Sequence, residues 1–509
     1  MKIQVRPDIL FILLVSIVLQ FFLSLNNSVP EYDEATYFDI SRNIVKTALP
    51  YRSQNEPPGT LYYFHPPLAR YITAISFLIF GEHLYVARAI NSCASLLLII
   101  LFCIWISSNF GTLSMIGWGV VLSAHSLFVT YSYSNYVELL FTMFCILGLL
   151  TFLKSEESLF PAQKSRFFII SGNFFGIAIL CKYHAILWLI PLIGYLLAKG
   201  KRYFETWLLL MPSLIALILW FSLAFYIDPS KFIHDAQAVL HQSFGTDQHD
   251  KNIPLTFFFF KMLLPAVGPM LLIGLPFLLV FAWFRKIDLW RNNIHFSLSL
   301  FISVTVLIAS LSVPYKVTRY AVPIIPLLLY CLADVTHQIT MVRCLPKWQS
   351  LFVWGVIGVT LLTSSPLMDV GLMISRKAWG RPRQFGGIYT EALRQDQHYQ
   401  GIEEIALSIK KHAKYPTTLY LAEEDLANRI TYYTGLHFCS GDPCKKATLL
   451  LFNSKSQQSR EYILSRIDDL ENYIEVENFK NIGLFIGEVS LWKRRLTSSI
   501  YHARHWPYA

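Results

Sequence analysis

The stretch ILFILLVSIVLQFFLSL at residues 9–25 is followed closely by EYDEATY at residues 31–37. The first stretch approaches the roughly 20 apolar residues of a membrane-spanning helix. The second places three carboxylates just beyond its end. Carboxylates are costly to hold near lipid, so residues of this kind usually have a function there. We therefore predict a membrane protein with a functional polar segment directly after its first span.

The composition also indicates an integral membrane protein. The 509 residues are 54% hydrophobic, and the mean hydropathy is +0.44, which is too apolar for a water-soluble surface. The formal net charge is +10. The basic residues are scattered over short loops, a pattern typical of topology control and not of nucleic-acid binding. We expect the first span to be retained, because no small-residue cleavage site follows it.

About eleven apolar stretches approach the length of roughly 20 residues that a membrane span needs. They lie near residues 8–25, 88–107, 111–132, 135–153, 167–181, 184–198, 206–227, 259–284, 294–313, 321–335 and 350–367. The sequence therefore predicts a polytopic α-helical membrane protein, with a count that merged or split segments would change by about one or two.

Positive charges orient these spans. Lys and Arg cluster in alternate loops, near residues 154–166, 199–202, 285–291 and 343–347, on the same side as the N-terminus. The positive-inside rule makes that side cytoplasmic. An odd number of spans then places the C-terminal region, and the acidic segment after the first span, outside the cytoplasm.

Two long loops are predicted on the outer side, at residues 26–87 and 228–254. Within the first, residues 67–81 are apolar but too few to span comfortably, and we interpret them as a helix lying in the membrane interface. The alternative is a short true span, which would invert the topology that follows and break the pattern of charges.

The chain changes character after the predicted transmembrane domain, residues 1–367. In residues 368–509 charged residues increase and long apolar runs stop. Strands are predicted at 417–421, 447–452 and 482–486, and helices at 402–412 and 461–472. This alternation predicts a small extracytoplasmic α/β domain. Cys439 and Cys444 flank a polar turn there, and the sequence leaves open whether they form a disulfide.

Polar residues from distant parts of the sequence converge on the outer face in this topology. They are Asp33, Glu34, His65, Glu138, Lys182, Lys316 and Arg319. A carboxylate can accept a proton from a hydroxyl group, while Lys and Arg can bind a phosphate. At a membrane surface that phosphate is expected to belong to a lipid. A sugar on such a phosphate can be transferred in one inverting displacement, without a strong general acid.

Each of these residues also has a structural alternative. Asp33 and Glu138 could cap the helices that follow them, and Lys182 could extend its ammonium group from a helix end towards water. His65 could form hydrogen bonds within a proline-rich turn. Lys316 and Arg319 could be ordinary charges at a membrane boundary.

The same residues resemble those of the GT-C glycosyltransferases, in particular bacterial enzymes similar to protein O-mannosyltransferases and to the lipid A aminoarabinose transferase. The resemblance lies in Asp33-Glu34 after the first span, His65-Pro66-Pro67-Leu68 in the same loop, and Lys316-Val317-Thr318-Arg319-Tyr320 before a late span. It covers residues 1–335, and the C-terminal domain is similar only in position and size.

The resemblance implies that Asp33 is the catalytic base, with Glu34 as a weaker second candidate. It places Glu138 near the acceptor or the donor sugar and Arg319 near the lipid phosphate. His65 stands where the aminoarabinose transferase has a phosphate-binding Lys, and Phe64 stands where it has a Glu proposed as a metal ligand. The first departure argues against that exact donor and leaves the role of His65 open. Because of the second, we carry over no metal site and expect no cofactor, with a divalent metal left open as the alternative.

These observations predict an inverting glycosyltransferase. It would move a sugar from a polyprenyl-phosphate donor to a hydroxyl of a lipid (similar to lipid A or lipopolysaccharide), a glycan or a protein outside the cytoplasm. The branch that the chain resembles implies the bacterial inner membrane. Two alternatives stay open. One is a transporter or flippase of a lipid-linked substrate, which would favour ionisable residues near mid-membrane and internal repeats. The other is an oligosaccharide ligase of the same membrane class.

Overall fold

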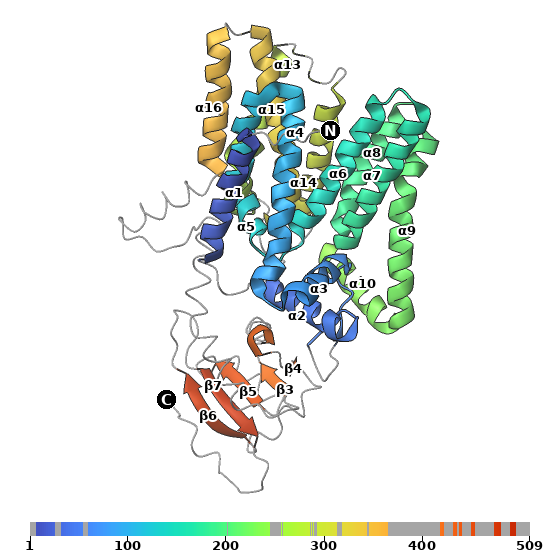
Figure 1. Cartoon of the computed structure of the whole chain (residues 1–509), viewed down its shortest axis with the longest axis vertical. Helices are drawn as coiled ribbons and strands as arrows, with labels where there is room; N and C mark the ends of the chain where they lie inside the picture. Colours follow the sequence, from blue (N-terminus) through green and yellow to red (C-terminus); the bar gives the residue numbers. More distant parts are fainter. Residues whose placement is uncertain are drawn as a thin grey trace, which may run out of the picture. The chain divides into compact units, whose positions relative to one another are not determined.

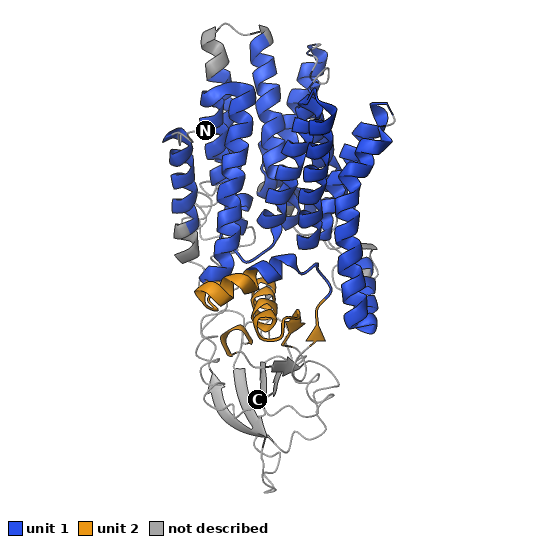
Figure 2. Cartoon of the chain, turned by 45° about the vertical axis from the view of Figure 1, so that its right-hand side comes forward, with its two compact units in different colours: residues 1–25, 63–72, 85–391 blue, residues 26–62, 73–84, 392–509 orange. Residues whose placement is uncertain are grey.

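The computed structural model describes residues 7–25, 32–53, 60–200, 202–244, 256, 258–285, 287, 289, 293–312, 318–343, 346–364, 418–421, 431–434, 437–439, 449–453, 473–479 and 489–494. The chain forms two compact units (Figure 2). The first comprises residues 1–25, 63–72 and 85–391, and the second comprises residues 26–62, 73–84 and 392–509.

The first unit is a bundle of apolar helices (Figure 1). Its long elements are α1 (Pro7–Leu25), α4 (Leu84–Ala124), α5 (Ser126–Ser132), α6 (Glu138–Glu157), α7 (Pro161–Cys181), α8 (Ile186–Ala198), α9 (Tyr203–Ile227), α10 (Pro229–Phe244), α13 (Leu275–Phe284), α14 (Ile294–Ser312), α15 (Ile325–Arg343) and α16 (Pro346–Ser364). Short helical segments join them: η1 (Tyr183–Ala185), η2 (Phe258–Leu263), α12 (Leu264–Val267), η3 (Met270–Gly274) and η4 (Thr318–Ile324). Helix α3 (Leu68–Phe80) begins in this unit and continues into the second.

The predicted polytopic α-helical fold is confirmed. Among the described residues, six helices are long and apolar enough to cross a membrane, and five apolar helices are shorter. Every predicted span has a helical counterpart. Element α4 consists of two helices that meet at Gly111, whose backbone is not helical (φ +81°, ψ 174°), so the spans expected at 88–107 and 111–132 are separate, and the second continues into α5. Helix α3 has 13 residues and is one of the five shorter apolar helices. Its position in the membrane interface stays a prediction.

Two regions differ in detail from the prediction. The span expected at 259–284 is broken into η2, α12, η3 and α13, with a left-handed residue at Gly268 (φ +99°). Pro265 and Pro269 lie beside this break, and proline cannot donate the helical hydrogen bond that would continue the segment. In the predicted outer loop 228–254, residues 229–244 form helix α10.

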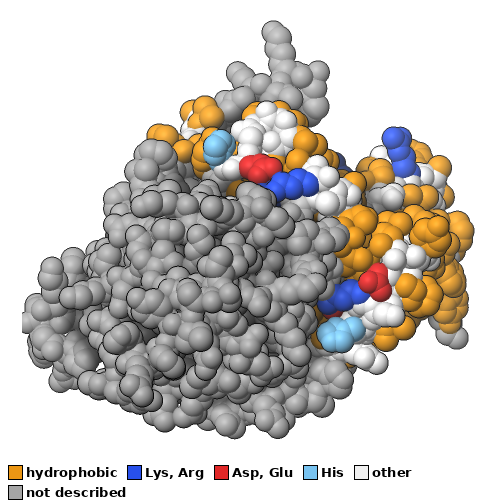
Figure 3. Space-filling model, turned by 90° about the horizontal axis from the view of Figure 1, so that it is seen from below, with side chains coloured by type: hydrophobic (Ala, Val, Ile, Leu, Met, Phe, Trp, Pro, Cys, Tyr) orange, Lys and Arg blue, Asp and Glu red, His pale blue; other side chains and the backbone are white. Residues whose placement is uncertain are grey.

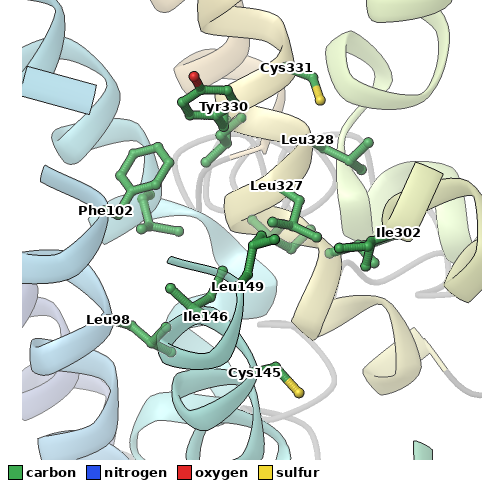
Figure 4. Close-up of a cluster of buried hydrophobic side chains, with 14 of the residues drawn as sticks. Leu98, Phe102, Cys145, Ile146, Leu149, Ile302, Leu327, Leu328, Tyr330 and Cys331 are labelled. Carbon is green, nitrogen blue, oxygen red and sulfur yellow. The ribbon is translucent and has the colours of Figure 1, made fainter. Parts of the chain in front are cut away.

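The core of the first unit is apolar and centres on α15. Leu98 and Phe102 of α4, Ile146 of α6, Ile302 of α14 and Leu327 of α15 are buried together (Figure 4). In the most apolar window around α15, 89% of residues are buried, whereas in α9 the value is 22%. Thus α15 is surrounded by other helices, while α9 lies at the periphery.

The outward surface of the peripheral helices is apolar. On α9, Trp207, Ile218, Leu219 and Tyr226 are each more than half exposed. Figure 3 shows hydrophobic side chains over much of the described surface on one face, with few charged side chains between them. A surface of this kind suits contact with lipid tails and not with water.

Helices α6, α7 and α9 approach one another closely because small residues line their contacts. Ser171 donates a hydrogen bond to the carbonyl oxygen of Gly148 at 2.7 Å, and Ser213 donates to that of Gly172 at 3.2 Å. A Cβ atom at Gly172 would overlap the carbonyl oxygen of Leu209. Small-residue contacts and interhelical hydrogen bonds of this type drive helix association in membranes.

One end of α6 collects the basic residues of two predicted cytoplasmic loops. Glu156 is almost fully buried and accepts hydrogen bonds from Arg202 at 2.7 Å, Lys199 at 3.4 Å and the hydroxyl of Tyr195 at 3.1 Å. Lys164 lies 3.8 Å from the same carboxylate. Glu138 is the first residue of α6, at the opposite end of the helix. The charged side chains around Glu156 and the carboxylate of Glu138 are therefore separated by almost the full length of a 20-residue helix, about 30 Å.

In the second unit, helix α2 (Tyr32–Thr47) holds a short hairpin of β1 (Tyr51–Arg52) and β2 (Thr60–Leu61). The carboxylate of Asp39 accepts hydrogen bonds from the backbone N–H of Ser53 at 2.7 Å and from its hydroxyl at 2.8 Å. Asn43 donates to the carbonyl oxygen of Tyr51 at 3.0 Å. These contacts fix the C-terminal half of α2 against the chain that follows it.

Helix α2 also contacts the helical turn at residues 431–434, near the other end of the chain. Arg42 forms an ion pair with Asp39 at 3.3 Å and donates to the carbonyl oxygen of Thr431 at 3.1 Å. The rings of Phe38 and Tyr432 meet edge to face at 4.7 Å. The second unit therefore combines the start and the end of the sequence.

The C-terminal part of the second unit contains a five-stranded sheet. Its strands are β3 (Thr418–Leu421), β4 (His437–Cys439), β5 (Leu449–Asn453), β6 (Tyr473–Phe479) and β7 (Val489–Arg494), in the order β4-β3-β5-β7-β6. Strand β3 is parallel to β4 and β5, and β7 is antiparallel to β5 and β6. The strands expected at 417–421 and 447–452 are confirmed as β3 and β5. The expected helices, the strand at 482–486, Cys444 and the domain boundary after residue 367 lie outside the described residues.

The close approach at Gly172 generates a stability prediction. Gly172→Ala should destabilise the bundle by about 1–3 kcal/mol, because its methyl group would push α7 away from the backbone of α9. Gly194→Ala in α8 is the matched control, since nothing lies within 4 Å of its Cβ position. Thermal unfolding in detergent should show a lower melting temperature for Gly172→Ala only. Equal melting temperatures for both variants would contradict the packing described here.

Candidate functional site

The loop before α6 is held from two sides, and this fixes where Glu138 stands. The side chain of Asn91 on α4 donates hydrogen bonds to the carbonyl oxygens of Ser134, at 2.7 Å, and of Tyr136. Arg70 on α3 donates to the carbonyl oxygen between those two, at 3.4 Å. All three carbonyl groups belong to the loop that leads directly into α6. Glu138 is therefore placed at the first position of that helix by buried polar contacts.

Glu138, Lys182 and Arg319 form a buried ionic cluster. The Nζ atom of Lys182 lies 2.6 Å from Oε1 of Glu138, and Nε of Arg319 lies 3.6 Å from the same oxygen. Glu138 and Lys182 are 1% and 4% exposed. Among the described residues, Oε2 of Glu138 has no hydrogen-bond partner. Within the part of the chain that is described, both cations therefore approach the same carboxylate oxygen of Glu138.

Aromatic rings hold the two cations in place. The Nζ atom of Lys182 lies 4.9 Å from the centre of the Tyr320 ring, and the guanidinium of Arg319 lies 5.1 Å from that of Tyr136. Such cation–π contacts partly replace the water that burial removes. The ring of His184 stacks obliquely on Tyr320 at 4.7 Å. A small cavity beside this cluster is lined by Phe141, Lys182, His184, Trp188, Val306, Arg319, Tyr320 and Pro323.

His65 belongs to the same charged region. Burial is the largest cause that lowers the pKa of His65 well below 6.5, and repulsion from Lys182, Arg319 and Arg70 lowers it further. The residue as a whole is partly accessible to solvent. His65 is therefore a neutral imidazole beside several cations, able to accept or donate one hydrogen bond without adding charge.

The structure thus brings together four of the seven predicted site residues: His65, Glu138, Lys182 and Arg319. Asp33 and Glu34 lie in the second unit, in the first turn of α2. Glu34 is 1% exposed, whereas Asp33 is partly accessible. Both stand inside the helix, so neither is its capping residue. Lys316 lies outside the described residues.

Sequence reasoning missed Arg70, Tyr136 and His184. Tyr136 lies two positions before Glu138, and His184 lies two positions after Lys182. Neither residue belongs to a sequence pattern that indicates a role in a binding site. Arg70 follows the Pro-Pro-Leu segment by two residues. Its role in holding the loop before α6 follows only from the folded structure, in which Arg70 donates a hydrogen bond to that loop.

Metal binding has no support in the geometry of the described residues. Across that part of the chain, no three side chains of His, Cys, Asp or Glu gather closely enough to hold a metal ion. His234 lies on α10, and the side chains of His241 and His249 lie outside the part that is described. The expectation of a site without metal stays a prediction.

Residues 64–226 match the protein-family model described as dolichyl-phosphate-mannose-protein mannosyltransferase. The matched segment includes His65, Glu138 and Lys182 and covers less than half of the chain. No curated protein sequence matches the chain.

Solved structures of low sequence identity share the fold. ArnT from Cupriavidus metallidurans, bound to undecaprenyl phosphate, is similar with a TM-score of 0.64 at 15% identity, over 95% of this chain and 97% of that one. The archaeal oligosaccharyltransferase AglB from Archaeoglobus fulgidus, in complex with an inhibitory peptide and a dolichol-phosphate, is similar with a TM-score of 0.56 at 11% identity, over 94% of this chain and 73% of that one. The chain therefore has the GT-C fold, and the resemblance predicted from its sequence motifs is confirmed.

The ionic cluster makes a prediction about stability. In Glu138→Leu, Lys182 and Arg319 would stay buried with no carboxylate between them, which should cost about 3–5 kcal/mol. The double variant Glu138→Leu/Lys182→Met should recover part of this loss, because it removes one of the two buried cations that lost their contact with Glu138. Thermal unfolding of the three proteins in detergent measures both effects. A double variant less stable than Glu138→Leu would contradict the proposed charge balance.

The lowered pKa of His65 makes a second prediction. Below pH 6.5, the reference pKa of His65, the unfolded chain takes up a proton that the folded protein excludes. Stability should therefore fall as the pH drops through this range. In His65→Gln this contribution is absent, so the melting temperature should fall less between about pH 7.5 and about pH 5.5 than it does in the wild type. If the melting temperature of the variant fell by as much as that of the wild type or by more, His65 would not be the group whose protonation is disfavoured in the folded protein.

Proposed function

We propose that this chain is an inverting membrane glycosyltransferase that moves a sugar from a polyprenyl-phosphate donor to a hydroxyl group of an acceptor. The observation that carries the proposal is the buried cluster in which Lys182 and Arg319 both contact the carboxylate of Glu138 and both line a small cavity. Two fixed cations beside a cavity suit an anion such as a phosphate. A GT-C fold supports the same reading, because ArnT and AglB, with which the chain shares that fold, were solved with lipid phosphates.

The cluster would act mainly on the leaving group. When the bond between the anomeric carbon and the phosphate oxygen breaks, the electron pair stays on the phosphate and its negative charge increases. Lys182 and Arg319 are held in position by Glu138 and by aromatic rings. In the proposed reaction they stabilise the negative charge that develops on the leaving phosphate. Because these cations are held before the reaction begins, little energy is lost in reorienting them. Lys316 is proposed to add a further cation, and His65 a hydrogen bond.

The other half of the reaction needs a base. We assign this role to Asp33, which the resemblance implies and which is a partly accessible residue in the first turn of α2. Asp33 would take the proton of the acceptor hydroxyl while the hydroxyl oxygen forms its bond to the anomeric carbon. Glu34 is buried and is proposed to support Asp33. Attack opposite to the departing phosphate inverts the anomeric centre.

The proposed location is the bacterial inner membrane, with the N-terminus in the cytoplasm. Glu138 and Glu156 lie at the two ends of α6, and the basic loops predicted to be cytoplasmic gather around Glu156. The positive-inside rule therefore supports an extracytoplasmic position for Glu138. The acceptor is proposed to be a lipid, a glycan or a protein on that side.

Asp33→Asn tests the assigned base. Purified protein would be given polyprenyl-phosphate sugars and candidate acceptors, and sugar transfer would be measured. The variant should lose about 10²–10⁴-fold in kcat, the usual contribution of a general base. Glu82→Gln is the matched control, because Glu82 is an exposed carboxylate of the same predicted loop. Unchanged transfer by Asp33→Asn would reject the assignment, and no transfer by the wild type with any donor would favour a transporter.

A further inference from the structure

Tyr63, two residues before His65, is seated in an aromatic pocket at the corner between α9 and α10. Its ring is 3% exposed. The ring centres of Trp220 on α9 and Phe232 on α10 lie 5.8 Å and 6.2 Å away, both edge to face. Edge-to-face pairs of this kind stabilise beyond the area that they bury. These contacts of α9 and α10 therefore fix Tyr63, which lies two residues before His65 of the proposed donor site.

Asp235 on α10 holds the backbone at the same position. Its Oδ2 atom accepts the backbone N–H of Tyr63 at 2.9 Å, across 172 residues of sequence. Its Oδ1 atom accepts a hydrogen bond from Lys231 at 2.6 Å and lies 3.3 Å from the ring nitrogen of His234. Asp235 is 5% exposed. A buried carboxylate that accepts a backbone N–H forms one of the stronger hydrogen bonds in proteins.

Trp220 connects this corner to a second segment of the site. Its indole N–H donates to the hydroxyl of Tyr183 at 3.1 Å. Tyr183 stands between Lys182, which pairs with Glu138, and His184, which lines the cavity. One tryptophan thus contacts the residue that precedes His65 by two positions and the residue that follows Lys182. Displacement of the corner would move both segments together.

We infer that Asp235 is a positioning residue for the donor-phosphate site, because it holds the backbone of Tyr63 and thereby places His65. Trp220 supports the segment that contains Lys182 in the same way, through its hydrogen bond to Tyr183. This inference rests on the proposed function. Asp235 touches neither the cavity nor the ionic cluster, so its contribution is geometric. Misplacement of a binding group by about 1 Å can cost about 10²-fold in rate, and a backbone contact two residues away controls displacements of this size.

The chain offers a graded set of variants for the kinetic test. Asp235→Asn keeps an oxygen that can accept the N–H of Tyr63, whereas Asp235→Ala removes it. Lys231→Met is the matched control, because it removes the Lys231–Asp235 ion pair and leaves the contact with Tyr63. We expect kcat/KM for the donor to fall about 10–100-fold in Asp235→Ala, and to stay within about threefold of the wild type in the other two. Equal losses in Asp235→Ala and Lys231→Met would overturn the inference.

Hydrogen exchange tests the positioning without sugar transfer. In Asp235→Ala the amides of Tyr63, Phe64 and His65 should exchange at least about tenfold faster, as expected when a charge-assisted hydrogen bond is lost. In Lys231→Met they should exchange as in the wild type. Unchanged exchange in Asp235→Ala would show that Asp235 does not hold this segment. Faster exchange with unchanged kcat/KM would also reject the inference, because the segment would then move without affecting the donor.

These two measurements separate the inference from the proposed function. If the wild type transfers no sugar, the glycosyltransferase proposal fails, while hydrogen exchange still decides whether Asp235 holds the Tyr63 segment. If the wild type is active and Asp33→Asn is inactive, but Asp235→Ala equals the wild type, the function stands and the positioning role of Asp235 fails.

Discussion

The ion pair between Lys182 and Glu138 is the constraint around which the first unit is arranged. Its 2.6 Å contact is almost completely withdrawn from solvent. A buried charge is tolerated only with a well-placed partner and further polar contacts. The surrounding structure supplies these: the hydrogen bonds from Asn91 and Arg70 fix the start of α6, and the rings of Tyr320 and Tyr136 face the two cations. Much of the local sequence therefore serves to hold a small number of charges.

The charge balance of this cluster connects stability with function. Glu138 keeps Lys182 and Arg319 in place through contacts of 2.6 Å and 3.6 Å. In the proposed function the same two cations receive the donor phosphate. Neutral His65 adds hydrogen-bonding capacity and no charge, because burial and the same cations lower its pKa. The same residues thus stabilise the folded protein and are the ones that the proposed function assigns to phosphate binding.

Sequence reasoning recovered the fold, because it depends on local signals, and it named four residues that the structure brings together: His65, Glu138, Lys182 and Arg319. Apolar runs identify spans whatever their neighbours are, and an isolated Glu138 or Lys182 at the end of such a run is conspicuous. The broken segment at 259–284 was hidden, since an apolar run that contains Pro265, Gly268 and Pro269 has the same hydropathy as a straight helix. Arg70 and Asp235 were also hidden. Their partners lie 65 and 172 residues away in sequence, and no local sequence pattern predicts contacts between residues so far apart.

The link from Arg42 to the carbonyl oxygen of Thr431 joins residues that are 389 positions apart. A ribosome makes α2 long before it makes Thr431. Until Thr431 is made, the helix that carries Asp33 and Glu34 lacks this contact and the ring of Tyr432 against Phe38. Closure of so long a loop is a late and entropically opposed step of folding. Helix α2 therefore acquires its final packing only after residues 431–434 have been made.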